Sequence, residues 1–174
     1  IKDNLIEFPE GFIAEDVIFN LRFYSRANSF DTIDLATLNV TKRQDSVTSI
    51  YKADLLRAYL KVHQEVVEYL LYKNVSHDKL TILSDSLLVR NIVFTLLNEF
   101  KNTDNSLVQK IQKSNKILEN CTVLTAIRNP NLIKPYFNSN IKIRFVQLLS
   151  ILLRYRFKYP AYLILWVSRK LVKI

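Results

Sequence analysis

Two groups of polar residues in the first 48 positions have types and spacing that could do chemistry. The first is the adjacent pair Glu15 and Asp16, which follows the apolar turn Phe8-Pro9-Glu10-Gly11 and opens a predicted helix. A carboxylate placed at a helix start can accept a proton from a hydroxyl group, which is the task of a general base. The simpler interpretation is an acidic pair that only matches the helix dipole.

The second group is Arg43, Ser46 and Thr48, which share the segment RQDSVT. A guanidinium fork matches phosphate oxygens, and short hydroxyl side chains complete such a cradle. The spacing therefore indicates a turn that binds an anion. The alternative is an ordinary polar turn that leads into a helix, with Asp45 or Ser46 as its cap.

Together the two groups resemble the acceptor-side end of a family 2 glycosyltransferase domain of the GT-A type. Many bacterial members have an apolar turn with a glycine, then Glu-Asp and an apolar helix, and then two short strands that lead into an Arg-x-x-Ser-x-Thr turn. The residues that match this order are Gly11, Glu15, Asp16, Val17, Phe19, Arg43, Ser46 and Thr48. The similarity covers about a quarter of the chain, and the segment Leu38-Asn39-Val40-Thr41 departs from it, because the corresponding strand is usually rich in tyrosine.

The resemblance implies a role for each group. Asp16 would be the general base that deprotonates the acceptor hydroxyl, and Glu15 would orient the acceptor or the base. Attack on the anomeric carbon of a nucleotide-sugar would then proceed with inversion. Arg43, Ser46 and Thr48 would lie near the donor diphosphate or the acceptor, which would be a glycan or a lipid-linked sugar of a surface polysaccharide.

Members of the resembled family carry a donor-nucleotide half before this region. That half has an Asp-x-Asp motif that holds a divalent metal, Mg or Mn, on the diphosphate. This sequence contains no Asp-x-Asp and begins with Ile1 rather than methionine. We therefore expect the C-terminal portion of a longer enzyme, with the metal bound by the preceding half, none in this chain, and no transfer by the chain alone.

The pattern of apolar residues predicts a mainly α fold, in which a helical bundle follows a short α/β remnant of a GT-A domain. The remnant would be a helix from Glu15 and two short strands, Thr32–Leu35 and Leu38–Lys42. Further helices are predicted over Ser49–Lys73, Asp78–Phe100, Ser106–Asn120, Ile141–Phe157 and Pro160–Lys173. Thr103 or Asp104 is the expected N-cap of the helix that follows Phe100. The predicted division is 1–48 for the glycosyltransferase end, 49–120 for the bundle and 121–174 for a basic extension.

Scarce residue types exclude several kinds of site. One glycine rules out a Gly-rich phosphate loop, and one cysteine rules out an internal disulfide. With two histidines, the chain does not supply a usual structural zinc site. We expect Cys121 to be a buried structural thiol and His63 to be a packed or surface residue rather than a metal ligand.

The net charge of +9 lies at one end of the chain. Residues 1–119 contain 15 Lys/Arg and 16 Asp/Glu, whereas residues 120–174 contain 10 Lys/Arg and no acid. Aromatic and aliphatic residues alternate with these cations, which favours contact of 141–174 with an anionic membrane surface. The alternative is that these helices simply pack on the bundle. The expected location is cytoplasmic, peripheral at the inner face of the plasma membrane. A homo-oligomer is a further possibility.

Two other functions compete with sugar transfer. One is a non-enzymatic helical adaptor or membrane-surface binding module, in which Glu15 and Asp16 are only a helix start. The other is a helical domain that binds nucleic acid through its basic end. We rank the last one lowest, because no recognisable nucleic-acid reader motif accompanies the charge, and nucleic acid is not among the expected partners.

Overall fold

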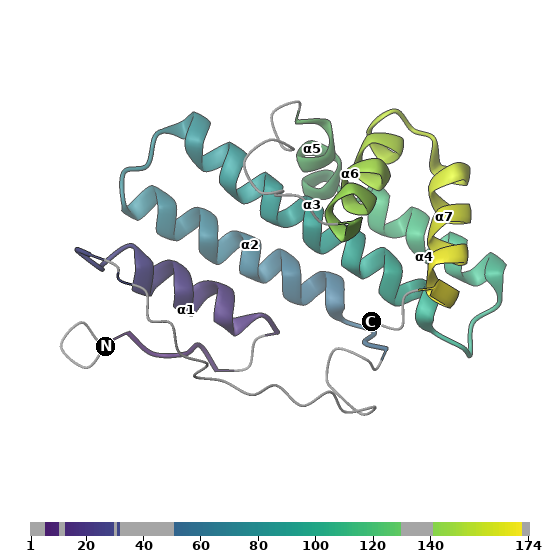
Figure 1. Cartoon of the computed structure of the whole chain (residues 1–174), viewed down its shortest axis with the longest axis horizontal. Coiled ribbons are helices and arrows are strands. Elements are labelled where there is room, and N and C mark those ends of the chain that lie inside the picture. The colour runs from purple at the N-terminus through teal and green to yellow at the C-terminus, as the bar shows by residue number, and fades with distance from the viewer. Residues whose placement is uncertain (1–5, 11–12, 30, 32–50, 130–140, 172–174) are drawn as a thin grey trace.

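The computed structural model describes residues 6–10, 13–29, 31, 51–129 and 141–171, and this part of the chain confirms the mainly α prediction (Figure 1). Its helices are α1 (Glu15–Tyr24), α2 (Leu55–Tyr72), α3 (His77–Lys101), α4 (Leu107–Glu119), α5 (Cys121–Arg128), α6 (Ile141–Arg154) and α7 (Lys158–Leu171). The strands expected over Thr32–Leu35 and Leu38–Lys42 lie outside the described residues.

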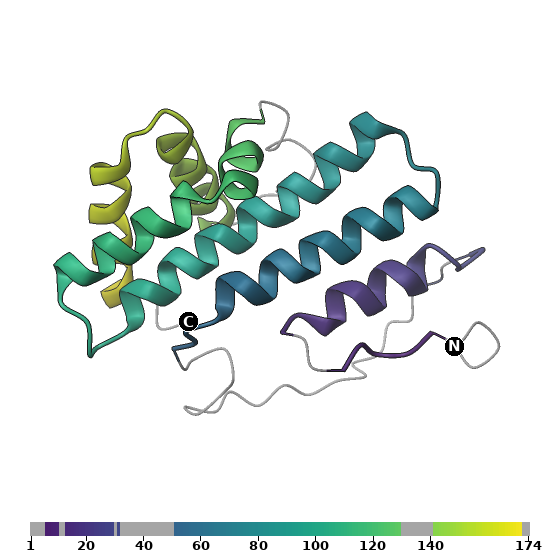
Figure 2. The same ribbon diagram turned by 180° about the vertical axis from the view of Figure 1, so that it is seen from behind.

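A hairpin of two long helices, α2 and α3, forms the centre of the fold (Figure 1). Helix α1 lies along α2 on the side away from α3, and helices α4 to α7 gather around α3, as the view from behind also shows (Figure 2). The turn between α2 and α3 is a Schellman motif: Asn74 has φ 54°, and the amides of Asn74 and Val75 donate to the carbonyls of Leu71 and Leu70. Asparagine tolerates this left-handed conformation better than most residues, so the break predicted at Asn74 has a structural cause.

Helix α2 begins at Leu55, so the prediction of a helix from Ser49 was wrong at its start. Residues 51–54 are not helical because the Asn98 side chain of α3 forms hydrogen bonds with both the amide and the carbonyl of Lys52. Its side-chain oxygen accepts from the Lys52 amide at 3.1 Å, and its side-chain amide donates to the Lys52 carbonyl at 2.8 Å. A partner 46 positions away in the sequence thus decides where this helix starts.

The N-cap of α4 is Ser106, which corrects the prediction of Thr103 or Asp104. Ser106 and Gln109 form a capping box, in which each side chain accepts from the backbone amide of the other. Helix α5 was not predicted as a separate element. Asn120 ends α4 and at the same time caps α5, because its side-chain oxygen accepts from the Val123 amide at 3.3 Å.

The core of the described residues has two parts. The smaller part joins α1, α2 and the first half of α3 around Val62, and the larger part joins the second half of α3 with α4, α5, α6 and α7 around the fully buried Phe100. Helix α3 runs through both. Its length and composition would also suit a membrane span, but most of its apolar stretch is buried inside the fold, as in the core helix of a bundle.

Candidate functional site

The start of α1 carries the predicted catalytic pair in an exposed position. Glu15 and Asp16 are the first two residues of the helix, and both side chains are exposed. Ala14, the N-cap, is left-handed with φ 65° and ψ 38°, and it has no side-chain oxygen to satisfy the first amides of the helix. Two carboxylates therefore stand at an uncapped helix start, next to a residue held in a conformation that alanine disfavours.

Replacing Ala14 with glycine should stabilise the fold. Glycine adopts a positive φ without the steric cost that alanine incurs, which is about 1 kcal/mol. Urea unfolding should therefore show a free energy of unfolding higher by about that amount. Ala58→Gly, at a position inside α2, is the matched control and should lower the free energy of unfolding by about 1 kcal/mol. A destabilised Ala14→Gly protein would show that Ala14 is not strained.

The turn before the acidic pair is attached to the same helix. The Phe8 ring stacks on the Phe19 ring, with centroids 3.9 Å apart and planes 5° apart, and Ile6 is buried. Helix α1 is in turn held on α2, because Arg22 forms an ion pair with Glu65 at 3.6 Å and the hydroxyls of Ser25 and Tyr69 are hydrogen-bonded. The acidic pair thus stands on a helix that is held at its middle and at its C-terminal end.

Asp16 also has charged and aromatic neighbours that were not predicted as site residues. Burial raises the pKa of Tyr59 on α2; the Arg90 guanidinium on α3 acts in the opposite direction, and the Asp16 carboxylate adds to the rise. Asp16 and Arg90 therefore both lie within electrostatic reach of the Tyr59 hydroxyl.

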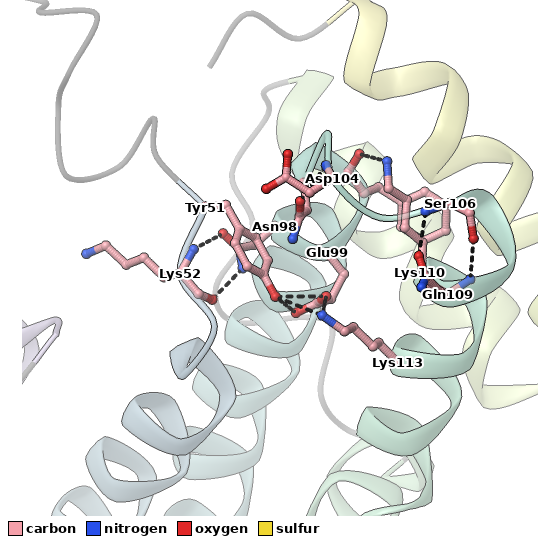
Figure 3. A network of polar contacts seen from close by, with 11 residues as sticks. Tyr51, Lys52, Asn98, Glu99, Asp104, Ser106, Gln109, Lys110 and Lys113 are labelled. Atoms are coloured by element: carbon pink, nitrogen blue, oxygen red, sulfur yellow. Dashed lines mark hydrogen bonds and ion pairs between the residues drawn. The ribbon is translucent and has the colours of Figure 1, made fainter.

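The other predicted site residues, Arg43, Ser46 and Thr48, lie outside the described residues. Tyr51, the first described residue after them, is held by a polar network (Figure 3). The Tyr51 hydroxyl donates to both carboxylate oxygens of Glu99 at 3.3 Å, and the Lys113 ammonium lies 4.0 Å from that carboxylate and 3.4 Å from the Tyr51 oxygen. The segment RQDSVT is thus followed, three residues after Thr48, by an anchored tyrosine.

Glu99 is the buried acid of this network. Burial raises the pKa of the Glu99 carboxyl, while Lys113 and the hydrogen bond from Tyr51 lower it in part. The three groups join the chain before α2 to the end of α3 and to α4, and Asn98 beside them holds Lys52. The arrangement is that of a structural clamp, because each polar group of Glu99 is used within the fold.

His63, Asp85 and Asn129 form a second polar cluster, in which Asp85 is buried and the other two are half-buried. The Asn129 side-chain amide donates to one Asp85 oxygen at 2.8 Å, and His63 Nε2 lies 3.9 Å from the other, too far for a hydrogen bond. His63 was predicted to be a packed or surface residue, and its side chain is only 14% exposed. Among the residues that the structure describes, no three His, Cys, Asp or Glu side chains form a group that could hold a metal ion.

The lowered pKa of His63 should make the fold less stable in mild acid than at neutral pH. Burial lowers the pKa of His63, and the Asp85 carboxylate opposes this only in part. The unfolded chain therefore takes up a proton at about pH 6.5, before the folded chain does, so stability falls as the pH drops through that value. In His63→Gln, the loss of unfolding free energy between about pH 7.5 and about pH 5.5 should be smaller than in the wild type.

His77→Gln is the matched control for this measurement, since His77 is the other histidine and is exposed in the first turn of α3. Urea unfolding of this variant should retain the wild-type difference between the two pH values. Equal losses in the wild type and in His63→Gln would contradict the assignment of acid sensitivity to His63.

Cys121 is exposed, so the prediction of a buried thiol was wrong. It is the first residue of α5, a short helix that buries Val123, Ala126 and Ile127 against the core. This inward face leaves position 121 on the outside. The prediction rested on the usual burial of a free cysteine and not on a helix face, because no helix was predicted over 121–128.

Comparisons with known proteins add no assignment. No family model matches the chain, and neither the curated proteins nor the solved structures give a significant match.

Proposed function

We propose that this chain is the C-terminal, acceptor-side portion of an inverting glycosyltransferase of the GT-A type. The observation that carries the proposal is the start of α1, where the Glu15-Asp16 pair of the family pattern stands exposed at an uncapped helix end. Strained backbone next to reactive groups is a recurrent feature of active sites, and Ala14 provides it directly before the pair. The segment 1–48 is then the remnant of the GT-A domain, and the helices form an extension.

In the proposed reaction, Asp16 accepts the proton of an acceptor hydroxyl. The hydroxyl oxygen forms a bond to the anomeric carbon of the sugar as the bond from that carbon to the nucleoside diphosphate breaks, and the configuration inverts. Exposure of Asp16 gives a hydroxyl of a glycan or a lipid-linked sugar access to the carboxylate. Glu15, next to it, orients the acceptor or the base.

Arg43, Ser46 and Thr48 are proposed to contact the donor diphosphate or the acceptor. A divalent metal, Mg or Mn, would neutralise the diphosphate, and the donor-nucleotide half of the enzyme would bind it. The clamp around Glu99 holds Tyr51, three residues after Thr48. The proposed process is surface polysaccharide biosynthesis at the cytoplasmic side of the plasma membrane.

The test is a transfer assay on the longer enzyme. Its purified form is incubated with a panel of nucleotide-sugars and with membranes of the source cell as acceptor, and sugar transfer and nucleotide release are measured with and without EDTA. We expect transfer from at least one donor, and its loss with EDTA. The 174-residue chain alone is the control and should give none.

Absence of transfer from every donor, or a parent gene without an Asp-x-Asp half before this region, would overturn the proposal. The remaining alternatives would then be a non-enzymatic helical adaptor or membrane-surface binding module, and a helical domain that binds nucleic acid.

A further inference from the structure

The connection between α6 and α7 exposes large apolar side chains. We call residues 154–159, with the sequence RYRFKY, the hairpin tip. Tyr155, Phe157 and Tyr159 alternate there with basic residues and are 65%, 57% and 80% exposed. Large aliphatic side chains are also exposed on the two helices, Leu148 and Ile151 on α6 and Leu163 and Val167 on α7. In a soluble domain these residues would usually be turned inward.

The end of α6 and a contact between α7 and α4 fix the position of the hairpin tip. Helix α6 ends in a Schellman motif, in which the amides of Arg156 and Phe157 donate to the carbonyls of Leu153 and Leu152. The left-handed position of this motif usually holds glycine, but here it holds Arg156, with φ 63°. Helix α7 is meanwhile fixed on α4, since the Tyr162 hydroxyl donates to Asn115 Oδ1 at 2.8 Å. An exposed arginine thus occupies a position where glycine would fold more easily.

The positive charge of this surface indicates the kind of partner that it binds. Arg154, Arg156 and Lys158 lie in the tip, and residues 120–174 contain ten basic residues and no acid. Such a surface attracts an anionic partner. Aromatic rings beside cations also suit nucleic acid, where bases stack on them. The exposed leucines, isoleucine and valine have no such use with nucleic acid, whereas the acyl region of a bilayer accepts them.

We infer that the hairpin tip and the adjoining faces of α6 and α7 dock on an anionic lipid surface. Tyr155, Phe157 and Tyr159 lie at the depth of the head groups, and Arg154 and Arg156 bind lipid phosphates. The inference does not depend on sugar transfer, since it uses none of the residues proposed to act in that reaction.

Vesicle flotation of the complete protein tests the inference. Vesicles of phosphatidylcholine alone are compared with vesicles that also contain phosphatidylglycerol. We expect binding to the anionic vesicles only, and weaker binding in high salt. Arg156→Gly should weaken binding about fivefold and Phe157→Ser about tenfold. Arg156→Gly should also raise the unfolding temperature, because glycine suits the left-handed position, so its weaker binding would not reflect misfolding.

Lys79→Gln is the control for charge, because it removes one exposed cation from the first turn of α3. It should bind anionic vesicles as the wild type does. Absence of vesicle binding, or equal binding by Arg156→Gly, Phe157→Ser and the wild type, would overturn the inference. Salt-sensitive binding to single-stranded DNA or RNA without binding to vesicles would also overturn it, in favour of a nucleic-acid surface.

Discussion

Asp16→Asn in the longer enzyme should lower kcat for sugar transfer about 10²–10⁴-fold, the usual contribution of a general base. Asparagine has nearly the size of aspartate but does not take up the proton of the acceptor hydroxyl. The KM for the nucleotide-sugar should stay close to that of the wild type, because the donor is bound elsewhere. Steady-state kinetics with varied donor and varied acceptor measure both quantities.

The variant should fold normally, since Asp16 is exposed and its loss at a helix start costs at most about 1 kcal/mol. Asp78→Asn is the matched control: Asp78 is also an exposed acid in the first turn of a helix, here α3, and its variant should keep the wild-type kcat. The kcat of Glu15→Gln should lie between those of Asp16→Asn and Asp78→Asn. A kcat of Asp16→Asn close to the wild-type value would remove Asp16 from the role of base.

Phe100→Ala should lower the free energy of unfolding by about 3–5 kcal/mol, the largest stability effect we expect from a single change. Phe100 is fully buried near the end of α3, and its ring lies 6.1 Å from the ring of Tyr162 on α7. Its removal leaves a cavity in the larger core, at the position where α3, α4 and α7 meet. Such a loss is a large share of the stability of a domain of this size.

Urea unfolding followed by circular dichroism measures this effect. Phe94→Ala is the matched control, because Phe94 lies on the same helix but is only half-buried, with the Arg90 guanidinium 5.5 Å from its ring centroid. Phe94→Ala should lower the free energy of unfolding clearly less than Phe100→Ala does. A cost below about 1 kcal/mol for Phe100→Ala would show that this side chain is not a centre of the core.

Helical spacing of apolar residues was enough to predict most of the fold. Helices α3 and α4 start and end within one residue of their predicted bounds, and α1 starts at the predicted Glu15, because turn residues beside the apolar stripes limit them. Asn74 after α2 is an example, because the tolerance of a positive φ is a property of the asparagine itself and needs no distant partner. Local signals also predicted that Glu15 and Asp16 open α1.

Features that depend on distant residues were not predictable in this way. The start of α2 depends on Asn98, and the neighbours of Asp16 come from α2 and α3. The end of α6 at Arg154 rather than Phe157 depends on a left-handed arginine, which no propensity favours. Arg43, Ser46 and Thr48 lie outside the described residues, so their approach to Asp16 stays a prediction.

The anomeric configuration of the product tests the central claim most directly. The longer enzyme is given an α-linked nucleotide-sugar, and the coupling constant of the anomeric proton in the new glycosidic bond is measured by NMR. A single displacement with Asp16 as base predicts a β-linked product. An α-linked product would contradict the account, because retention requires a different mechanism from attack by a hydroxyl that Asp16 deprotonates.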